Sequence, residues 1–442
     1  MRKLLLAFCL LVAVATAGFA QSTMMGMGDS LGEGVQSYNA WYETQANGYL
    51  SYIAKQAGAS FRLPLIKSDS KGIAGVANRH RQRIDATSIP SNLAVNGAKV
   101  TDVLGDVAGT NPRREVDLVL PPYYGLSQIE IVEQVKPKLV YLWIGNNDVI
   151  DYVLDWKHLN QPHGTPISTF TNQYYQLITR LKNAGVAAVL GNIPDVTKIA
   201  FLVDNDTLTS YTGTNYNLPV GYYTTLPTLI SLKLGNLDAS VLQDPNYVLS
   251  PDRLAFIRTQ IQMYNDVITN AAASAGYAIA DTADIFNQFA ESPVVIGDVV
   301  LTNKFNGGAF SLDGVHPSNV GYATLAKAFI QAANFKFDTG IPQITLDQMI
   351  DIVNVDPFVD RNGNGVVAGR PNTGLLESLY VELGFSGDTN DLNVSAPIAA
   401  PKKADPNAFM RIYFAGIGKN PNTPWTRADL SDALDVIFGV RH

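Results

Sequence analysis

The sequence of 442 residues contains a single cysteine, Cys9, so no disulfide can form within the chain. Only 16% of the residues are charged, and the formal net charge is -7. A basic surface, which nucleic-acid binding requires, is therefore not expected. The chain has no internal repeat and no low-complexity tract. Because 46% of its residues are hydrophobic, a chain of this length can be stabilised by a buried core alone.

The first twenty residues have the pattern of a secretory signal peptide. Arg2 and Lys3 precede an apolar run over 4–17, and Gly18-Phe19-Ala20 gives the small-x-small pattern of a cleavage site. Cleavage after Ala20 leaves 442 − 20 = 422 residues. The run is too short to span a membrane, and Cys9 lies too early in it for a lipid-attachment site. We expect an exported protein, secreted, periplasmic or associated with the cell surface, with no transmembrane segment after cleavage.

Short apolar runs alternate with helical patterns, which predicts parallel βαβ units. The predicted strands cover residues 23–27, 138–145, 186–192 and 277–281, and the predicted helices cover 47–58, 170–184, 251–276 and 321–334. Residues 60–90 are expected to form an extended loop. Residues 195–250 have little regular period and are interpreted as a large insertion. The sequence thus predicts one α/β domain over 21–335, followed by a C-terminal extension or small helical module over 336–442 whose role it does not specify.

A serine lies between glycines near the start of the chain, in Gly28-Asp29-Ser30-Leu31-Gly32. The spacing Gly-x-Ser-x-Gly is typical of the turn that exposes a nucleophilic serine after a strand. In a chain with 36 glycines the same spacing also fits an ordinary turn. The other groups of a catalytic site, and their order along the chain, must decide between a nucleophilic serine and an ordinary turn.

A serine nucleophile needs a base, and His316 is the candidate among the five histidines, which are His80, His158, His163, His316 and His442. Asp313 precedes His316 by three residues, so a turn can bring the carboxylate to the imidazole Nδ1 and leave the other nitrogen for the serine proton. Most Asp-x-x-His pairs are surface turns, so this pair alone is weak evidence. In an α/β-hydrolase, an oxyanion loop precedes the serine, and the acid and base lie on separate loops. Here Ser30 follows the first strand and Asp313 is three residues from His316, which excludes that design.

The sequence resembles the GDSL, or SGNH, hydrolase family over residues 22–335. Four blocks carry the resemblance: "GDSL" at 28–31, "NLAVNGA" at 92–98, "GNND" at 145–148 and "DGVHP" at 313–317. They occur in the order typical of the family. Each block alone is also compatible with a turn or a capped helix, and the second is the weakest match.

The resemblance implies a flavodoxin-like three-layer α/β/α sandwich with a parallel sheet and the site at the carboxyl ends of the strands. It implies that Ser30, Asp313 and His316 form the catalytic triad. It also implies three donors to the oxyanion, namely the N–H of Ser30, the N–H of Gly97 and the side-chain amide of Asn147. Asp29 and Asp148 are interpreted as structural, because a carboxylate beside the oxyanion would oppose its charge.

The function predicted on this basis is a secreted serine ester hydrolase of the carboxylesterase or lipase type. The insertion is rich in apolar side chains: Phe201, Leu202, Tyr211, Tyr216, Leu218, Tyr222, Tyr223, Leu226, Leu229 and Ile230. They can form a lid or acyl pocket, which favours a lipid or carboxylic ester and contact with a lipid interface, or they can simply pack on the domain. A carbohydrate acetylesterase, an arylesterase, or an inactive surface-binding protein on an SGNH scaffold are the alternatives.

No cofactor is expected for this chemistry. Asp360, Asn362 and Asn364 have the spacing of the first half of a calcium loop, although Pro371 stands where the closing carboxylate belongs. An Asn-Gly turn explains the same residues. Calcium is therefore the weaker of the two interpretations.

Overall fold

The computed structural model describes residues 24–67, 82–109, 114–120, 125–370, 374–392 and 404–438. The signal peptide, His80 and His442 lie outside these ranges. A parallel sheet of four strands forms the centre, in the order β1-β2-β3-β6. Their bounds are Met24–Gly28, Leu139–Trp143, Ala187–Gly191 and Ala278–Ala280. Residues 91–95 run beside β1, where the N–H groups of Leu93 and Val95 donate to the Gly26 and Gly28 carbonyls.

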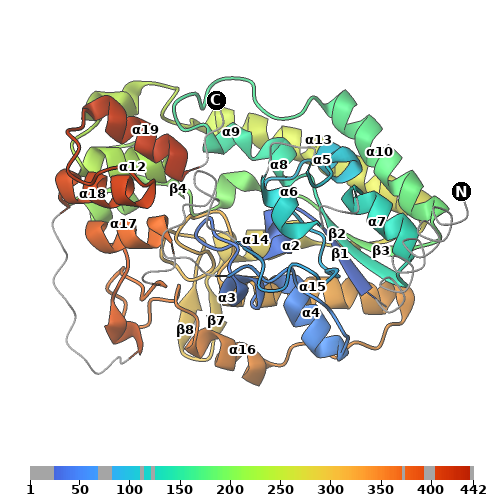
Figure 1. The fold of residues 1–442 in the computed structure, drawn as a ribbon. Helices are drawn as coiled ribbons and strands as arrows, with labels where there is room; N and C mark the ends of the chain where they lie inside the picture. The colour runs from blue at the N-terminus through green and yellow to red at the C-terminus, as the bar shows by residue number, and fades with distance from the viewer. Residues whose placement is uncertain are drawn as a thin grey trace, which may run out of the picture.

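The strands are short, apolar and buried because helices cover both faces of the sheet. On one face lie α4 (Tyr49–Ala57) and α15 (Asn319–Phe337), and on the other lie α5 (Val100–Gly105), α7 (Gln128–Val135), α10 (Ile167–Asn183) and α13 (Pro251–Ala275) (Figure 1). With the 91–95 segment at the edge, the strand order is that of a flavodoxin-like sheet. The predicted three-layer α/β/α architecture is confirmed.

Gly28 shows why β1 must end in glycine. Its φ is +142°, and a Cβ at this position would lie 2.1 Å from the Trp143 carbonyl oxygen on β2. No other residue fits so close to the neighbouring backbone. The Gln128 side chain binds both polar groups of Gly28, accepting from its N–H at 2.9 Å and donating to its carbonyl at 3.0 Å. The chain therefore leaves β1 in a fixed direction, directly before Ser30.

The region 195–250 is more regular than its sequence suggests. It contains η2 (Val196–Lys198), β4 (Leu202–Val203), α11 (Asn205–Thr212), β5 (Thr224–Thr225), α12 (Leu226–Lys233) and η3 (Ala239–Gln243). The lack of a regular period in the sequence has a physical reason. Residues 226–232 of α12 are all buried, so this helix has no polar face to create a visible period.

The C-terminal part is helical and shares its core with the α/β domain. It contains α16 (Leu346–Asn354), α17 (Leu375–Leu383), η4 (Thr389–Leu392), α18 (Pro406–Gly416) and α19 (Arg427–Ile437). The buried side chains of α17, α18 and α19 belong to the same continuous hydrophobic cluster as the strands of the sheet. Figure 1 shows α17, α18 and α19 at the end of the molecule away from α10.

The remaining elements are short. They are α2 (Ser30–Glu33), α3 (Tyr42–Gln45), α6 (Arg114–Val119), α8 (Asn146–Val149), α9 (Asp151–Leu154), α14 (Thr282–Glu291) and the hairpin of β7 (Val294–Ile296) and β8 (Val299–Leu301). In the predicted loop at 60–90, the described residues form no helix, and a bridge joins Ile66 and Arg83. None of the helices in the described ranges is long and apolar enough to cross a membrane.

Candidate active site

Ser30 is the first residue of α2 and stands at the carboxyl end of β1. Asp29 caps this helix, because its Oδ1 accepts the Leu31 N–H at 3.0 Å. Its Oδ2 accepts the Asn146 amide at 2.9 Å, which joins the turn after β1 to the turn after β2. Burial raises the pKa of Asp29 to about 6, against the lowering effect of these hydrogen bonds. Asp29 is fully buried, and its bonds are those of a residue that positions Ser30.

Gly97 and Asn147 lie on two neighbouring loops that a hydrogen bond holds together. The Asn147 Nδ2 donates to the Ala98 carbonyl at 2.9 Å. A side-chain amide carries two hydrogens, so one remains beyond this bond. Gly97 has a φ of +73°, a left-handed conformation that favours glycine. Both residues line the cavity described below.

Asp148 also connects the two loops that carry Gly97 and Asn147. Its Oδ1 accepts the Thr165 hydroxyl at 2.6 Å, and its Oδ2 accepts the Val100 N–H in the first turn of α5 at 3.2 Å. Burial raises the pKa of this carboxyl to about 6. Unlike Asn147, Asp148 is not among the residues that line the cavity.

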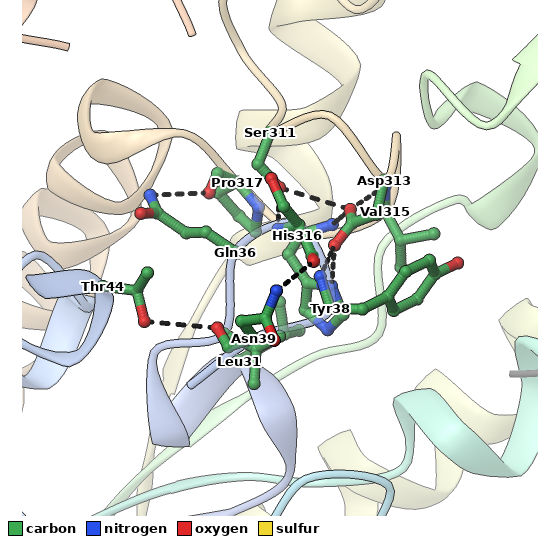
Figure 2. A network of polar contacts seen from close by, with 12 residues as sticks. Leu31, Gln36, Tyr38, Asn39, Thr44, Ser311, Asp313, Val315, His316 and Pro317 are labelled. Carbon is green, nitrogen blue, oxygen red and sulfur yellow. Dashed lines mark hydrogen bonds and ion pairs between the residues drawn. The ribbon is translucent and has the colours of Figure 1, made fainter. Parts of the chain in front are cut away.

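Asp313 and His316 form a buried pair before α15. Figure 2 shows the carboxylate facing the imidazole, with 2.7 Å between Oδ2 and Nδ1. The other oxygen, Oδ1, accepts the backbone N–H groups of Val315 and His316 at 2.8 Å each. Gly314 has a φ of +70° within this turn. The turn therefore fixes both carboxylate oxygens and leaves the His316 Nε2 as the nitrogen that Asp313 does not hold.

The charge of Asp313 is stabilised although the residue is completely buried. Burial alone would raise its pKa, but the charge of His316 and the hydrogen bonds outweigh burial and lower the pKa below its usual value. The Tyr38 N–H adds a further bond to Oδ2 at 2.8 Å, and the Tyr38 ring packs edge-on against the imidazole with 5.8 Å between centroids. The Ser311 hydroxyl donates to Oδ1 at 3.3 Å (Figure 2).

A cavity of about 480 Å³ lies over these groups. Ser30, Gly97, Asn147 and His316 all line it, while Asp313 lies behind His316. Its polar lining residues include Asn96, Lys99, Glu115, Asn146, Asp151 and Asp435. Its apolar lining residues are Leu31, Ile150, Leu154, Pro194, Val196, Ile199, Phe286, Val315, Val436, Ile437 and Phe438. The four sequence blocks thus meet at one cavity that has both a polar and an apolar part.

The cavity lining bears on the two interpretations of the insertion. None of the ten apolar residues from Phe201 to Ile230 that suggested a lid or acyl pocket lines it. Phe201, Leu226 and Leu229 are instead completely buried in the core, and Tyr211 packs against Phe305. Only the first turn of this region, through Val196 and Ile199, reaches the cavity. The alternative that the insertion packs on the domain therefore fits these ten residues.

Several residues of the site were not found from the sequence. Tyr38 acts mainly through its backbone N–H, and Gln128 is a hundred residues from Gly28, so neither has a local signal. Asn146 occupies the variable position of "GNND". The C-terminal residues 435–438 lie far beyond the last block. Contacts of this kind depend on the fold and not on a motif.

The remaining candidates lie away from the cavity. His158 and His163 both approach Asp155, at 2.9 and 3.7 Å. In the candidate calcium loop the two Asp360 oxygens accept the N–H groups of Gly363 and Gly365. The described residues contain no group of three or more His, Cys, Asp or Glu side chains arranged to hold a metal ion.

Asn362 and Asn364 donate their side-chain amides to one Asp388 oxygen, at 3.0 and 2.6 Å. Their own side-chain oxygens accept the N–H groups of Asn364 and Val366, two residues further on. These are the hydrogen bonds of consecutive Asx turns. Calcium binding by this loop stays a prediction.

The sequence model of the GDSL-like lipase/acylhydrolase family matches residues 24–329, which include all four blocks. The chain belongs to this family. The resemblance inferred from the blocks is therefore confirmed, and the residues after 329, with α19 among them, lie outside the family match. No curated protein matches the chain significantly.

Solved structures similar to this family member include two enzymes and a third protein. The acetylxylan esterase Axe2 of Geobacillus stearothermophilus is 17% identical, with 73% of this chain and 95% of that chain covered and a TM-score of 0.35. The α/β hydrolase LAE5 from the Lake Arreo metagenome is 14% identical, with 71% and 96% covered and a TM-score of 0.35. A putative SGNH hydrolase of Slackia heliotrinireducens is 14% identical, with 71% and 98% covered and a TM-score of 0.31.

Proposed function

We propose that the protein hydrolyses carboxylic esters through an acyl-enzyme, with Ser30 as nucleophile, His316 as general base and Asp313 as the group that orients His316. The 2.7 Å bond between Asp313 and His316, beside a cavity that Ser30 also lines, is the observation that carries this proposal. It holds the imidazole in one orientation with Nδ1 engaged. The nitrogen left for the serine proton is then Nε2.

In the first step the Ser30 Oγ attacks the ester carbonyl carbon, and its proton passes to the His316 Nε2. The carbonyl oxygen becomes an oxyanion. The N–H groups of Ser30 and Gly97 and the second amide hydrogen of Asn147 are the proposed donors to it. Collapse of the intermediate breaks the bond to the alcohol oxygen, which takes the proton from His316.

In the second step water attacks the acyl-enzyme and gives a proton to His316. The bond between the acyl carbon and the Ser30 Oγ breaks, the carboxylic acid leaves, and the proton returns to Oγ. Both steps use the same base and the same oxyanion donors. Neither step requires a cofactor.

The lining of the cavity supports an ester with an apolar acyl group. Eleven apolar side chains line it, including those of Ile150, Ile199 and Phe286. A buried methylene contributes about 0.8 kcal/mol, so an acyl chain of medium length gains more here than an acetyl group. The polar lining residues suit a polar alcohol portion. We therefore favour a carboxylesterase or lipase acting on a lipid or another carboxylic ester.

Hydrolysis of p-nitrophenyl acetate, butyrate and octanoate tests the proposal. Wild type should hydrolyse all three, and Ser30→Ala and His316→Ala should each lose on the order of 10⁴-fold or more in kcat. The double variant should be no worse than either single one. Tyr222→Ser, outside the cavity, is the matched control and should retain full activity.

A folded Ser30→Ala variant that kept substantial activity would contradict the assignment of the nucleophile. A wild type with no gain from acetate to octanoate would favour the carbohydrate acetylesterase or arylesterase alternative. A folded wild type without any ester hydrolysis would favour the inactive binding protein. Circular dichroism of each variant verifies that it is folded.

We also propose that the protein is exported after removal of residues 1–20. The charged start, the apolar run and the small-x-small site support this. Expression in a secreting host, followed by N-terminal sequencing of the exported protein, should give a chain that begins at Gln21. Recovery of uncleaved protein inside the cells would contradict it.

A further inference from the structure

Helix α19 forms one wall of the active-site cavity, although it begins more than a hundred residues after the catalytic histidine. Asp435, Val436, Ile437 and Phe438 all line the cavity that Ser30 and His316 share. Ile437 and Phe438 are buried, and Val436 is half-buried. This wall carries three consecutive apolar side chains.

A buried ion pair anchors this wall to the α/β domain. The Asp435 Oδ1 accepts the Trp156 indole N–H at 2.8 Å, and its Oδ2 pairs with the Lys157 ammonium. Only 7% of the Asp435 side chain is exposed. Trp156 and Lys157 follow α9, whose Leu154 lines the same cavity. A carboxylate buried this far is favourable only when such partners compensate for the lost water.

Aromatic contacts join α19 to the catalytic pair. The Phe438 ring packs edge-on against Tyr38 at 6.0 Å and against Phe201 at 5.8 Å between centroids. Tyr38 in turn packs against His316 at 5.8 Å. The end of α19 is thus fixed relative to the imidazole on one side and to Trp156 on the other.

The residues that line the cavity come from several segments of the chain. Asn96, Lys99 and Glu115 come from the loops around Gly97 and α6, and Lys99 pairs with Asp151 at 3.1 Å. Phe438 contacts Phe201, which follows Val196 and Ile199 in the chain, and α14, which carries Phe286, packs against η2. The acyl chain of the proposed substrate is apolar and fits beside these side chains.

We infer that α19 is a specificity element: Val436, Ile437 and Phe438 form the wall that receives the acyl chain, and Asp435 anchors that wall through Trp156 and Lys157. This inference rests on the proposed function. It assigns the choice of acyl length to a segment outside the family match.

The test compares Val436→Trp with Ala428→Trp, which adds the same side chain at an exposed position of the same helix. The ratio of kcat/KM on p-nitrophenyl octanoate to that on the acetate should fall about tenfold or more for Val436→Trp. The ratio should stay at the wild-type value for Ala428→Trp. Asp435→Ala should also lower the ratio, whereas Asp432→Ala, exposed on the same helix, should not.

An unchanged ratio for Val436→Trp in a protein that hydrolyses esters through Ser30 would overturn the inference and leave the proposed function intact. The inference would also be overturned if Val436→Trp changed kcat/KM according to the alcohol, as measured with ethyl and naphthyl acetates, and not according to the acyl chain. If wild type hydrolyses no ester, binding of octanoate measured by calorimetry decides the inference. Binding that Val436→Trp abolishes and Ala428→Trp preserves supports the wall, and binding equal in both overturns it.

Discussion

The Asn147 amide lies where two loops meet, with one hydrogen on the Ala98 carbonyl and its side chain at the cavity. A donor held in this way does not have to reorient when the carbonyl oxygen gains charge, and such preorganised donors act chiefly on the transition state. The same bond makes Asn147 part of the loop structure that presents Gly97. Its loss must therefore affect both the chemistry and the geometry of the neighbouring donor.

Asn147→Ala should lower kcat by roughly 10²–10³-fold with little change in KM. Asn147→Asp should be worse than the alanine variant, because a carboxylate repels both the Ala98 carbonyl and the oxyanion. Steady-state kinetics on p-nitrophenyl butyrate measure both variants. A variant in which only KM rises would assign Asn147 to ground-state binding.

For single residues of the candidate site, the sequence predicts those that have a characteristic spacing and misses those that act through the backbone. Asp313 and His316 are three apart, so one turn brings them together and their spacing is informative. Tyr38 reaches Asp313 through its N–H, which every residue type except proline can donate. This hydrogen bond therefore leaves no signal in the sequence.

Asp356 links two elements, the end of α16 and the start of α15. Its Oδ2 accepts the Val320 N–H in the first turn of α15 at 2.8 Å, and its Oδ1 accepts the Phe358 N–H at 3.1 Å. Helix α15 begins directly after the His316 turn. Burial raises the pKa of Asp356 to about 6, so the folded protein binds a proton here more tightly than the unfolded chain does.

The stabilising contribution of protonated Asp356 is complete near pH 4 and is lost as the pH rises to about 6. Relative to Asp356→Asn, which carries no titrating carboxyl, wild type should lose on the order of 3 kcal/mol over this range. Urea unfolding at several pH values measures the difference. Asp351→Asn, exposed on α16, controls for the removal of one negative charge, and an equal pH dependence in both variants would contradict the prediction.

Whether a helix could be predicted from the sequence depended on which of its faces are buried. Helix α10 has one buried face, with Phe170, Tyr174 and Leu177 at helical spacing, and its position was predicted closely. Helix α12 is buried all round and was missed. The strands of the sheet were predicted because continuous apolar runs bounded by turns are typical of buried parallel strands.

For the whole molecule, the large hydrophobic cluster is the decisive feature, since it runs from β1 to Phe438 among the described residues. The sequence suggested a boundary near residue 336, because the βα rhythm stops there. A change of rhythm shows that the type of structure changes. It does not show whether the later helices have a core of their own.

Differential scanning calorimetry should therefore show one unfolding transition and no separate one for residues 336–442. Leu379→Ala in α17, which removes a fully buried side chain, should destabilise that single transition by roughly 2–5 kcal/mol. Loss of esterase activity on heating should coincide with unfolding. Two resolved transitions, with activity following only the first or the second, would show that the C-terminal helices unfold independently.

The position of α19 has a consequence for how enzymes of this design diverge. The groups that we propose break the ester lie between residues 30 and 316, and the apolar wall that we assign to the acyl chain lies at 436–438. The two sets share no residue, so a substitution of Val436 can alter the preferred ester without replacing a reactive group. Enzymes that descend from this chain can therefore change their preferred ester through substitutions in α19, while the catalytic chemistry stays the same.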